Sequence, residues 1–374
     1  MSIFCSIPIW GQSGYEVLSR GIVLALDKLG VQIQIEPKDD WNYESCPLTL
    51  EEEARLLRMC TVKVSPNSYN IVQQYPGVTY LNSVESKYAK KRFCFSLFET
   101  TRCPAPWVPL LNQITETWVF SDFNVKTYTD SGVLNAHAIP FGVDTKLFTP
   151  TGESFNYTPK RDGDFIFATN GDYTERKNFE GLIEAYVKEF TDKDKVCLIV
   201  KTHSNGFIKR YKNECIRKLK TIVQRFNSIN PPRILFFGDK VPYDEMPKFY
   251  RAADCFVLFS RGEGLGLPYA EALACGVGVI STNFGGQMQF LNDKNALFVN
   301  SDIKVIDDLE YIKKCLWALN HSWAHPHVSD MREKMRFAYE MRDVIKEKGL
   351  QGRADMEKIT WKNAALQILE RIYA

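Results

Sequence analysis

Apolar runs of strand length alternate with longer segments of helical periodicity along most of this chain, and this alternation restricts its possible folds. It is the pattern of parallel sheets covered by helices. The strand candidates are residues 2–9, 31–35, 78–82, 93–98, 117–120 and 137–140 in the first half, and 164–169, 196–201, 233–237, 254–259 and 277–281 in the second. Two such series predict an α/β protein with two doubly wound units.

The length of the chain also favours two domains, because 374 residues exceed a usual single hydrophobic core. Proline, glycine and polar residues gather at 149–163, where we expect the boundary. Residues 1–150 then form the first domain and residues 151–354 the second. The last segment, about 355–374, carries its apolar residues close to one face of a helix.

Composition excludes several classes of protein. With 45% hydrophobic and 25% charged residues, the chain is typical of a soluble globular protein. Its 47 Lys and Arg against 45 Asp and Glu argue against a dedicated nucleic-acid binder. Neither a signal peptide nor an apolar run of about 18 residues is present, so we expect a cytoplasmic protein. Four cysteines in apolar segments are predicted to be buried, reduced thiols: Cys94, Cys197, Cys255 and Cys275.

The segment 262–276, GEGLGLPYAEALACG, carries the strongest functional signal. Glu263 lies in a glycine-flanked turn, Pro268 suits the first residue of a helix, and Glu271 lies about one turn inside it. The free N–H groups and the dipole of that helix favour a phosphate, and Gly264 and Gly266 let the backbone approach it. Carboxylates accept hydrogen bonds from hydroxyls, so the pair suits a phosphate with a sugar on each side. Such a ligand is a nucleotide sugar.

The whole string resembles the E-x7-E signature of the retaining glycosyltransferases of family 4, which have the GT-B architecture. Residues 95–132 and the turn IPFGVDTKLFTP at 139–150 extend the likeness. The resemblance implies two Rossmann-like domains that face each other across a cleft, with the donor bound by the second. It also implies that the helix at about 355–374 crosses back to the first domain.

The resemblance further implies the reaction. A hexose-type sugar would move, with retention, from a nucleoside diphosphate sugar to an acceptor; the donor would be a UDP-sugar or a GDP-sugar, with no additional cofactor. Glu263 would orient the transferred sugar and stabilise positive charge at its anomeric carbon, while Glu271 would hold the ribose. Phosphate or sugar oxygens would bind the backbone of Gly264, Leu265, Gly266 and Leu267.

Two cations follow the first strand of the second domain. Arg176 and Lys177 precede a helix whose cap is predicted to be Asn178, and they suit a leaving diphosphate. Many family members carry a further arginine just after that strand, where this chain has residues 170–172, NGD. Either Arg176 substitutes for it, or one fewer cation holds the diphosphate. Downstream, Gln287 and Gln289 stand where the family often has a glutamate.

In the first domain, Gly11 and Gly14 lie in a turn between a strand and a helix. Such a turn can hold a phosphate or be an ordinary tight turn. The resemblance places it against the donor diphosphate. Glu99 stands where some family members use a histidine, and it either acts on the acceptor or caps the following segment.

Two patterns resemble metal sites. The histidines of NHSWAHPHV, His321, His325 and His327, lack an acid or cysteine to complete a shell, so we favour a surface turn. Asp162 and Asp164 mimic a D-x-D motif, but they precede a strand instead of following one. We therefore expect no metal ion.

Several alternatives stay open. The basic amphipathic stretch 207–226 can cover a sheet, which we favour, or make a weak peripheral membrane contact. The acceptor is a glycan, a lipid carrier, a protein or a modified nucleic-acid base. The rival functions are a catalytically inactive nucleotide-sugar-binding GT-B module and a GT-B phosphorylase or epimerase. A nicotinamide oxidoreductase is disfavoured, because neither half carries a dinucleotide fingerprint.

Overall fold

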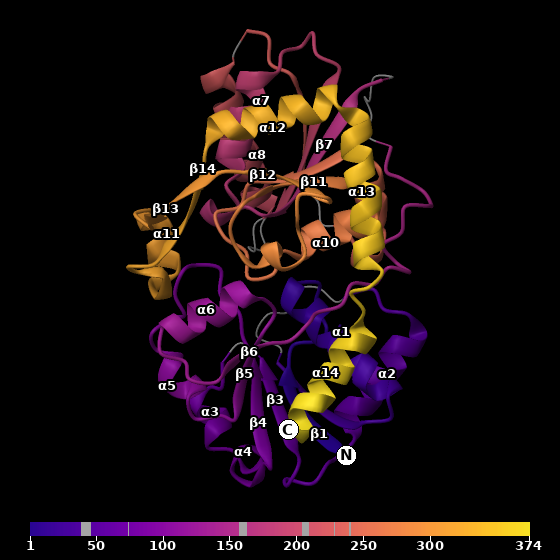
Figure 1. The fold of residues 1–374 in the computed structure, drawn as a ribbon, viewed down its shortest axis with the longest axis vertical. Helices are drawn as coiled ribbons and strands as arrows, with labels where there is room; N and C mark the ends of the chain where they lie inside the picture. The colour runs from indigo at the N-terminus through magenta and orange to yellow at the C-terminus, as the bar shows by residue number, and fades with distance from the viewer. Residues whose placement is uncertain (39–45, 74, 157–162, 204–208, 228, 239–240) are drawn as a thin grey trace. The chain divides into compact units, whose positions relative to one another are not determined.

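The computed structural model describes residues 1–38, 46–73, 75–156, 163–203, 209–227, 229–238 and 241–374 (Figure 1). By contacts within the chain, it divides into two compact units. Unit 1 is Met1–Val143 together with Ile359–Ala374, and unit 2 is Asp144–Lys358. Each unit is a six-stranded parallel sheet covered by helices, so both doubly wound α/β units expected from the sequence are present.

The sheet of unit 1 has the strand order β2-β1-β3-β4-β5-β6, and every neighbouring pair is parallel. Its strands are β1 (Ser2–Ile7), β2 (Gln32–Pro37), β3 (Tyr69–Gln73), β4 (Lys91–Phe95), β5 (Glu116–Val119) and β6 (Ala136–Ala138). Its helices are α1 (Gly14–Lys28), α2 (Leu50–Thr61), α3 (Val78–Leu81), α4 (Val84–Tyr88), α5 (Val108–Leu111), α6 (Asp122–Asp130) and α14 (Trp361–Tyr373).

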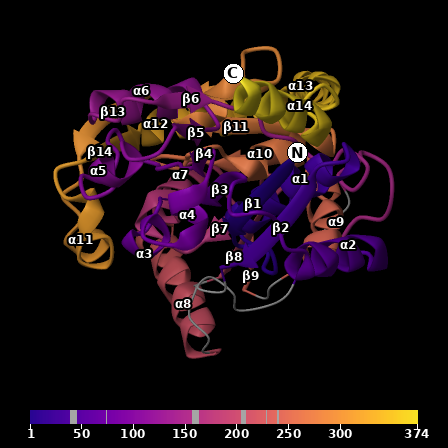
Figure 2. The same ribbon diagram turned by 90° about the horizontal axis from the view of Figure 1, so that it is seen from below.

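The C-terminal helix α14 packs beside α1 in unit 1 (Figures 1 and 2). The side chain of Thr360 caps its first turn by accepting a hydrogen bond from the Asn363 N–H at 3.2 Å. The indole of Trp361 then lies directly against Gly21, so that a Cβ atom there would stand 2.4 Å from the ring. This close approach requires glycine in the middle of α1.

One predicted strand of unit 1 was wrong. Residues 78–81 form the short helix α3, Asn82 follows as its C-cap, and Val78 is 63% exposed. The strand in its place is β3, which the sequence analysis missed because polar residues interrupt its apolar run. Asn70 is nevertheless buried, and its amide donates to the Glu85 carbonyl at 2.7 Å. Satisfied hydrogen bonds thus allow a polar residue inside a central strand.

The sheet of unit 2 has the strand order β12-β11-β10-β7-β8-β9, also parallel throughout. Its strands are β7 (Phe165–Asp172), β8 (Val196–His203), β9 (Arg233–Phe237), β10 (Cys255–Leu258), β11 (Gly278–Thr282) and β12 (Ala296–Val299). The chain runs outward in one direction from β7 and in the other from β10. The switch point of the topology therefore lies between β7 and β10, where open α/β sheets bind ligands.

The helices of unit 2 are α7 (Phe179–Glu189), α8 (Lys209–Phe226), α9 (Met246–Arg251), α10 (Leu267–Ala274), α11 (Leu309–Lys314), α12 (Val328–Glu340) and α13 (Arg342–Met356), with short 3-10 turns at η1 (Glu175–Lys177), η2 (Tyr243–Glu245), η3 (Gly286–Gln289) and η4 (Leu316–Ala318). α7 packs against both α8 and α12. α10 packs against α13 (Figure 1). In α8, the buried Leu219 joins the core of unit 2, as expected of a helix that covers the sheet.

The predicted buried thiols are confirmed. Cys94, Cys197, Cys255 and Cys275 are all free and buried. Burial raises the pKa of the Cys275 thiol to about 12, so this group stays protonated at neutral pH.

The histidine segment was predicted to be a surface turn and forms a strand instead. β14 (Ser322–Pro326) pairs antiparallel with β13 (Ser301–Val305), because Trp323 and Ala324 are buried there. His325 accepts a hydrogen bond from the Trp323 indole at 3.1 Å, and His327 lies 3.2 Å from Asp302. Within the described residues, no three His, Cys, Asp or Glu side chains are grouped as metal ligands.

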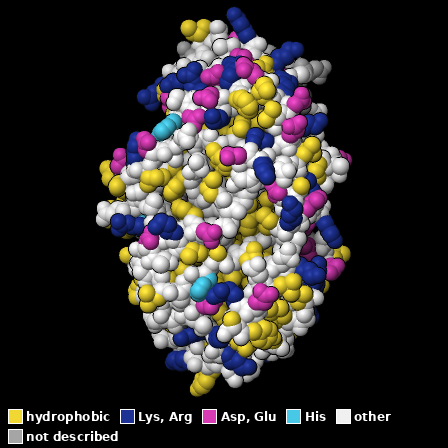
Figure 3. Space-filling model, viewed as in Figure 1, with side chains coloured by type: hydrophobic (Ala, Val, Ile, Leu, Met, Phe, Trp, Pro, Cys, Tyr) yellow, Lys and Arg dark blue, Asp and Glu magenta, His cyan; other side chains and the backbone are white. Residues whose placement is uncertain are grey.

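Charges of both signs are interspersed on the face drawn in Figure 3, without a large basic patch. None of the helices in the described part of the chain is long and apolar enough to cross a membrane.

Candidate functional site

The loops that follow β7 and β10 meet at the switch point of unit 2. Lys177, in η1 after β7, places its Nζ atom 2.7 Å from Oε1 of Glu263, which follows β10. The same oxygen lies 3.2 Å from Nη1 of Arg176. Two cations therefore share one carboxylate at the edge of the sheet where a ligand is expected. The structure thus brings three of the predicted catalytic residues together.

Hydrogen bonds between the two loops fix this arrangement. Arg176 donates to the Gly262 carbonyl at 2.6 Å, and the Arg261 N–H donates to the Arg176 carbonyl at 2.7 Å. Asn178 is the N-cap residue of α7, as predicted, but its side chain makes no capping hydrogen bond. With φ at 52°, it donates across to the Phe259 carbonyl at 3.1 Å. Asn178 thus combines a left-handed backbone conformation with a hydrogen bond to the loop that follows β10.

Glu263 is only 6% exposed, and its ionisation follows from its neighbours. Burial by itself raises its pKa, but the charges of Lys177 and Arg176 outweigh burial, and the pKa is lowered overall. The carboxylate is therefore charged at neutral pH. The two cations beside this carboxylate are groups that can bind an anionic ligand.

The backbone between Glu263 and α10 takes a tight course. Gly266 has a φ of 85°, in the left-handed region that favours glycine. Gly286 packs so closely that a Cβ atom on it would stand 1.9 Å from the Gly264 carbonyl oxygen. α10 begins at Leu267, so Pro268 is its second residue and not its first. Residues 264–267 thus form a compact turn at the helix start, with the side chains of Leu265 and Leu267 buried.

Glu271 lies inside α10 and forms a second buried cluster. Its Oε2 atom accepts a hydrogen bond from the Tyr250 hydroxyl at 2.7 Å, and the Tyr243 hydroxyl also donates to it. Burial raises the pKa of Glu271 to about 7, although both tyrosines and the charge of Lys201 act in the opposite direction. A carboxyl group with this pKa changes charge near neutrality.

Two residues of this cluster, Tyr250 and Lys201, were not predicted from the sequence. Tyr250 lies in the short helix α9, and nothing in its local pattern marks it. Lys201 stands near the end of the otherwise apolar run VCLIVK, and a lysine in a central strand is a signal that can be read. Gln287, noted at the position of a family glutamate, is fully buried, and its amide donates to the Phe284 carbonyl at 2.8 Å. Its side chain holds a turn of the backbone.

Gly11, predicted to lie against the donor diphosphate, has a partner within its own unit. The Gly11 N–H donates to Oε1 of Glu16 at 2.7 Å, and the Ser13 N–H donates to Oε2 at 2.8 Å. Ser13 and Glu16 form a capping box at the start of α1, whose first residue is Gly14. The S-x-x-E spacing in the sequence is the signal for this box. Glu16 thus occupies two N–H groups of the turn expected to face a phosphate.

Two further predicted positions can be placed. Glu99 is half-buried in the turn after β4 of unit 1. Asp164, of the D-x-D pattern, forms an ion pair with Arg233 at the start of β7, while Asp162 lies outside the described residues. The pairing with Arg233 gives Asp164 a structural role.

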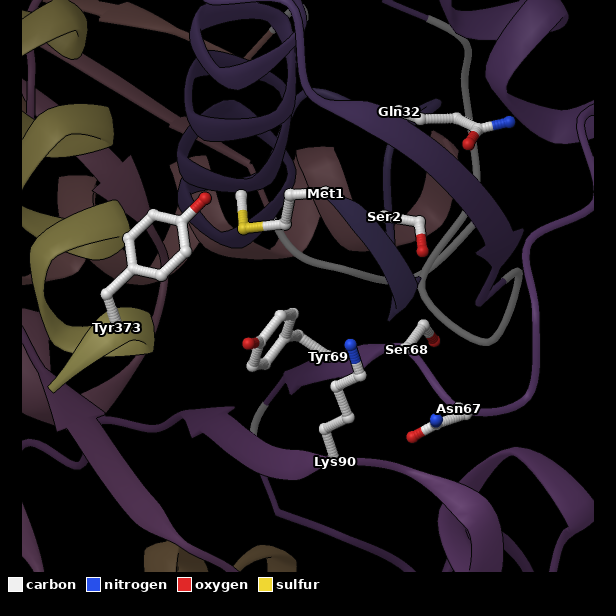
Figure 4. A pocket seen from close by; sticks show the side chains of 8 residues that line it. All are labelled: Met1, Ser2, Gln32, Asn67, Ser68, Tyr69, Lys90 and Tyr373. Atoms are coloured by element: carbon white, nitrogen blue, oxygen red, sulfur yellow. The ribbon is translucent and has the colours of Figure 1, made fainter.

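A cavity of about 360 Å³ lies in unit 1, at the edge of the sheet where its strands begin (Figure 4). Its lining residues are Met1, Ser2, Gln32, Asn67, Ser68, Tyr69, Lys90 and Tyr373. The Lys90 ammonium lies 5.5 Å from the centre of the Tyr69 ring. Ligands of open α/β sheets bind at the carboxyl ends of strands, so this cavity is separate from the candidate site.

Part of this chain is similar in sequence to known glycosyltransferases. Residues 151–316 match the family described as "Glycosyl transferases group 1". Over 184 residues the chain is 31% identical to a GDP-mannose-dependent monoacylated alpha-(1-6)-phosphatidylinositol monomannoside mannosyltransferase of Corynebacterium glutamicum, covering 46% of this chain and 45% of that protein. It is 26% identical over 169 residues to mannosylfructose-phosphate synthase of Agrobacterium fabrum, covering 44% and 36%. The matched part thus spans less than half of these curated relatives.

Solved structures resemble the whole chain. A sucrose-phosphate synthase of Thermosynechococcus elongatus superposes with a TM-score of 0.71 at 16% identity, covering 100% of this chain and 98% of that one. Anabaena HepE in complex with UDP-glucose superposes with a TM-score of 0.66 at 13% identity, covering 100% and 99%. These likenesses establish the GT-B fold, with two Rossmann-like domains. Residues 151–316, within the second unit, thus match the group 1 glycosyltransferases, and the chain as a whole has the GT-B fold.

Proposed function

We propose that this protein transfers a hexose from a nucleoside diphosphate sugar to an acceptor, with retention and without a metal ion. The observation that carries the proposal is the pair of cations, Lys177 and Arg176, on the buried carboxylate of Glu263 at the switch point of unit 2. A departing diphosphate develops negative charge, and fixed cations stabilise that charge in the transition state. Here the two side chains take the part that a divalent ion plays in metal-dependent transferases.

The remaining residues follow from the same assignment. The backbone of residues 264–267 and the start of α10 lie beside Glu263 and offer N–H groups to phosphate or sugar oxygens. Glu263, which is charged at neutral pH, orients the transferred sugar and stabilises positive charge at its anomeric carbon. Glu271 lies in α10 and is held by the hydroxyl of Tyr250. It accepts hydrogen bonds from the ribose hydroxyls.

The descriptions of two similar proteins indicate which donor sugars to test. One relative is described as GDP-mannose-dependent, and the Anabaena structure holds UDP-glucose. We propose a UDP-hexose or a GDP-hexose, and each nucleotide base forms one arm of the experiment.

Thermal unfolding with UDP, GDP, UDP-glucose and GDP-mannose tests donor binding. A ligand at 100 times its Kd stabilises the folded protein by about 2.7 kcal/mol, so the cognate nucleotide raises the unfolding temperature. Failure of all four to stabilise the protein would overturn the proposal.

Turnover is then measured as release of nucleoside diphosphate, with and without a panel of glycan, lipid-carrier and protein acceptors. Release that depends on an acceptor supports a transferase, whereas tight donor binding without release across the panel indicates an inactive binding module. Proton NMR of the product reports whether the anomeric configuration of the donor is kept. Unchanged turnover in excess EDTA supports a metal-independent reaction, and its loss contradicts one.

A further inference from the structure

A second buried lysine, Lys201, lies near the carboxyl end of β8, next to β7 in the unit 2 sheet. It is 4% exposed, which matches the 8% of Lys177 and the 6% of both Glu263 and Glu271. Lysine is almost never this buried in proteins unless it has a specific partner. The burial of Lys201 therefore calls for a role in this part of the sheet.

The contacts of Lys201 connect it to Glu271. Lys201 is paired in register with Asn170 on β7, so both side chains point to the same face, and its Nζ atom donates to Asn170 Oδ1 at 3.2 Å. Asn170 also hydrogen-bonds to Tyr250, whose hydroxyl donates to Glu271 at 2.7 Å. A continuous path of side chains thus runs from the Lys201 ammonium to the carboxyl group of Glu271.

The candidate site therefore contains two clusters, and each combines a carboxylate with a lysine. Lys177 and Arg176 accompany Glu263, while Lys201 accompanies Glu271 through Asn170 and Tyr250. The positive charge of Lys201 also acts directly on the ionisation of Glu271. Both clusters lie at the carboxyl ends of strands close to the switch point.

The chemistry of a nucleotide sugar gives these clusters different ligands. The α-phosphate is bonded to the ribose, and the β-phosphate is bonded to the transferred sugar. If Glu271 holds the ribose and Glu263 faces the sugar, then a cation in the Glu271 cluster meets the α-phosphate. The cations of the Glu263 cluster meet the β-phosphate.

We propose that Lys201 is a nucleotide-binding residue that contacts the α-phosphate of the donor, while Lys177 and Arg176 contact its β-phosphate. This inference rests on the proposed function. Asn170 is then a positioning residue, since its amide oxygen holds the ammonium of Lys201 at the edge of the sheet. The two phosphates are recognised by two separate lysines, Lys201 on β8 and Lys177 in η1, which follows the neighbouring strand β7.

The test compares a nucleoside with its mono- and diphosphate. Affinities for uridine, UMP and UDP, or for guanosine, GMP and GDP if the wild type prefers guanine, are measured by calorimetry on the full chain. Loss of one charge-assisted contact corresponds to a loss of about 10- to 100-fold in affinity. Lys201→Met is expected to lose this factor for the mono- and diphosphate alike and to bind the nucleoside as the wild type does. Lys177→Met is expected to lose it for the diphosphate alone.

Two conservative variants separate this role from a structural one. Lys201→Arg keeps the charge and is expected to restore most of the affinity for the monophosphate. Asn170→Asp keeps Lys201 but places a carboxylate beside its ammonium group. This variant is expected to bind the monophosphate more weakly and the nucleoside as the wild type does. Asn170→Asp also provides the test if Lys201→Met does not fold.

The outcomes distinguish the two proposals. A wild type that binds no nucleotide overturns the proposed function and this inference with it. A wild type that binds the diphosphate, with Lys201→Met keeping its affinity for the monophosphate within about two-fold, overturns this inference alone. An equal loss for nucleoside and monophosphate also overturns it, because a phosphate contact does not act on the nucleoside.

Discussion

The ammonium of Lys177 lies 2.7 Å from the carboxylate of Glu263, although 86 positions separate the two residues in the chain. Their loops follow β7 and β10, which are neighbours in the sheet. Both side chains are buried, so removing the charge of either residue is expected to lower the stability of the folded protein as well as to change the site.

Replacing Lys177 by methionine is expected to destabilise unit 2 and to slow turnover. Glu263 then loses its nearest cation while it stays buried beside Arg176, so we expect a loss of about 1–3 kcal/mol. Loss of a donor aimed at developing charge is expected to lower kcat by about 10²- to 10³-fold. Urea unfolding and donor turnover measure the two effects. Lys188→Met, which breaks the exposed pair with Glu184, is the control and is expected to change stability by under about 0.5 kcal/mol.

The carboxyl group of Glu271 is expected to make folding stability fall as the pH rises through neutrality. Its pKa is raised from 4.5 to about 7 in the folded protein, so the folded state binds the proton more tightly than the unfolded state. This contribution is fully present below pH 4.5 and is lost as the pH rises through 7, at a cost on the order of 3 kcal/mol. Glu271→Gln removes the titrating group and keeps an acceptor for Tyr250. Urea unfolding between pH 5 and 8 is expected to show a smaller decrease in the variant, and parallel curves would contradict the assignment.

Adding a methyl group at Gly286 is expected to displace the turn at residues 263–266. The new Cβ atom would stand 1.9 Å from the Gly264 carbonyl oxygen, which is backbone and cannot rotate away. We expect Gly286→Ala to lower stability by about 1–3 kcal/mol or more and to weaken donor binding. Gly77→Ala is the matched control, because nothing lies within 4 Å of a Cβ atom there. Thermal unfolding and donor titration of both variants check this, and equal behaviour would contradict it.

In unit 1, Gly21→Ala is expected to destabilise the protein although alanine favours helices. Propensity alone predicts a gain of about 1 kcal/mol in the middle of α1. However, the added Cβ atom would stand 2.4 Å from the Trp361 indole of α14. We therefore expect a net loss of about 1–3 kcal/mol in urea unfolding. In the background Trp361→Leu the same substitution is expected to be close to neutral, and a full loss there would show that the indole is not the cause.

Local patterns predicted most of the strands because a buried parallel strand is a continuous apolar run. The prediction failed where that relation breaks. Asn70 lies inside β3 with its amide satisfied by Glu85. Residues 78–81, in which the β-branched Val78 and Thr79 are exposed, form a helix instead. The prediction of a surface turn at the histidine segment was also wrong. Trp323 is buried there, and the segment pairs with β13, which lies elsewhere in the chain.

The sequence by itself determined the motif of the site, because Glu263, the glycine turn and Glu271 all lie within one short segment. Helical periodicity and the preferences of glycine and proline act over such distances. Only the tertiary structure decided that Lys177 and Arg176 share Glu263, and that Lys201 reaches Glu271 through Asn170 and Tyr250. These partners come from different strands and helices, and the order of strands in a sheet is set by the packing of the whole domain and not by any local sequence.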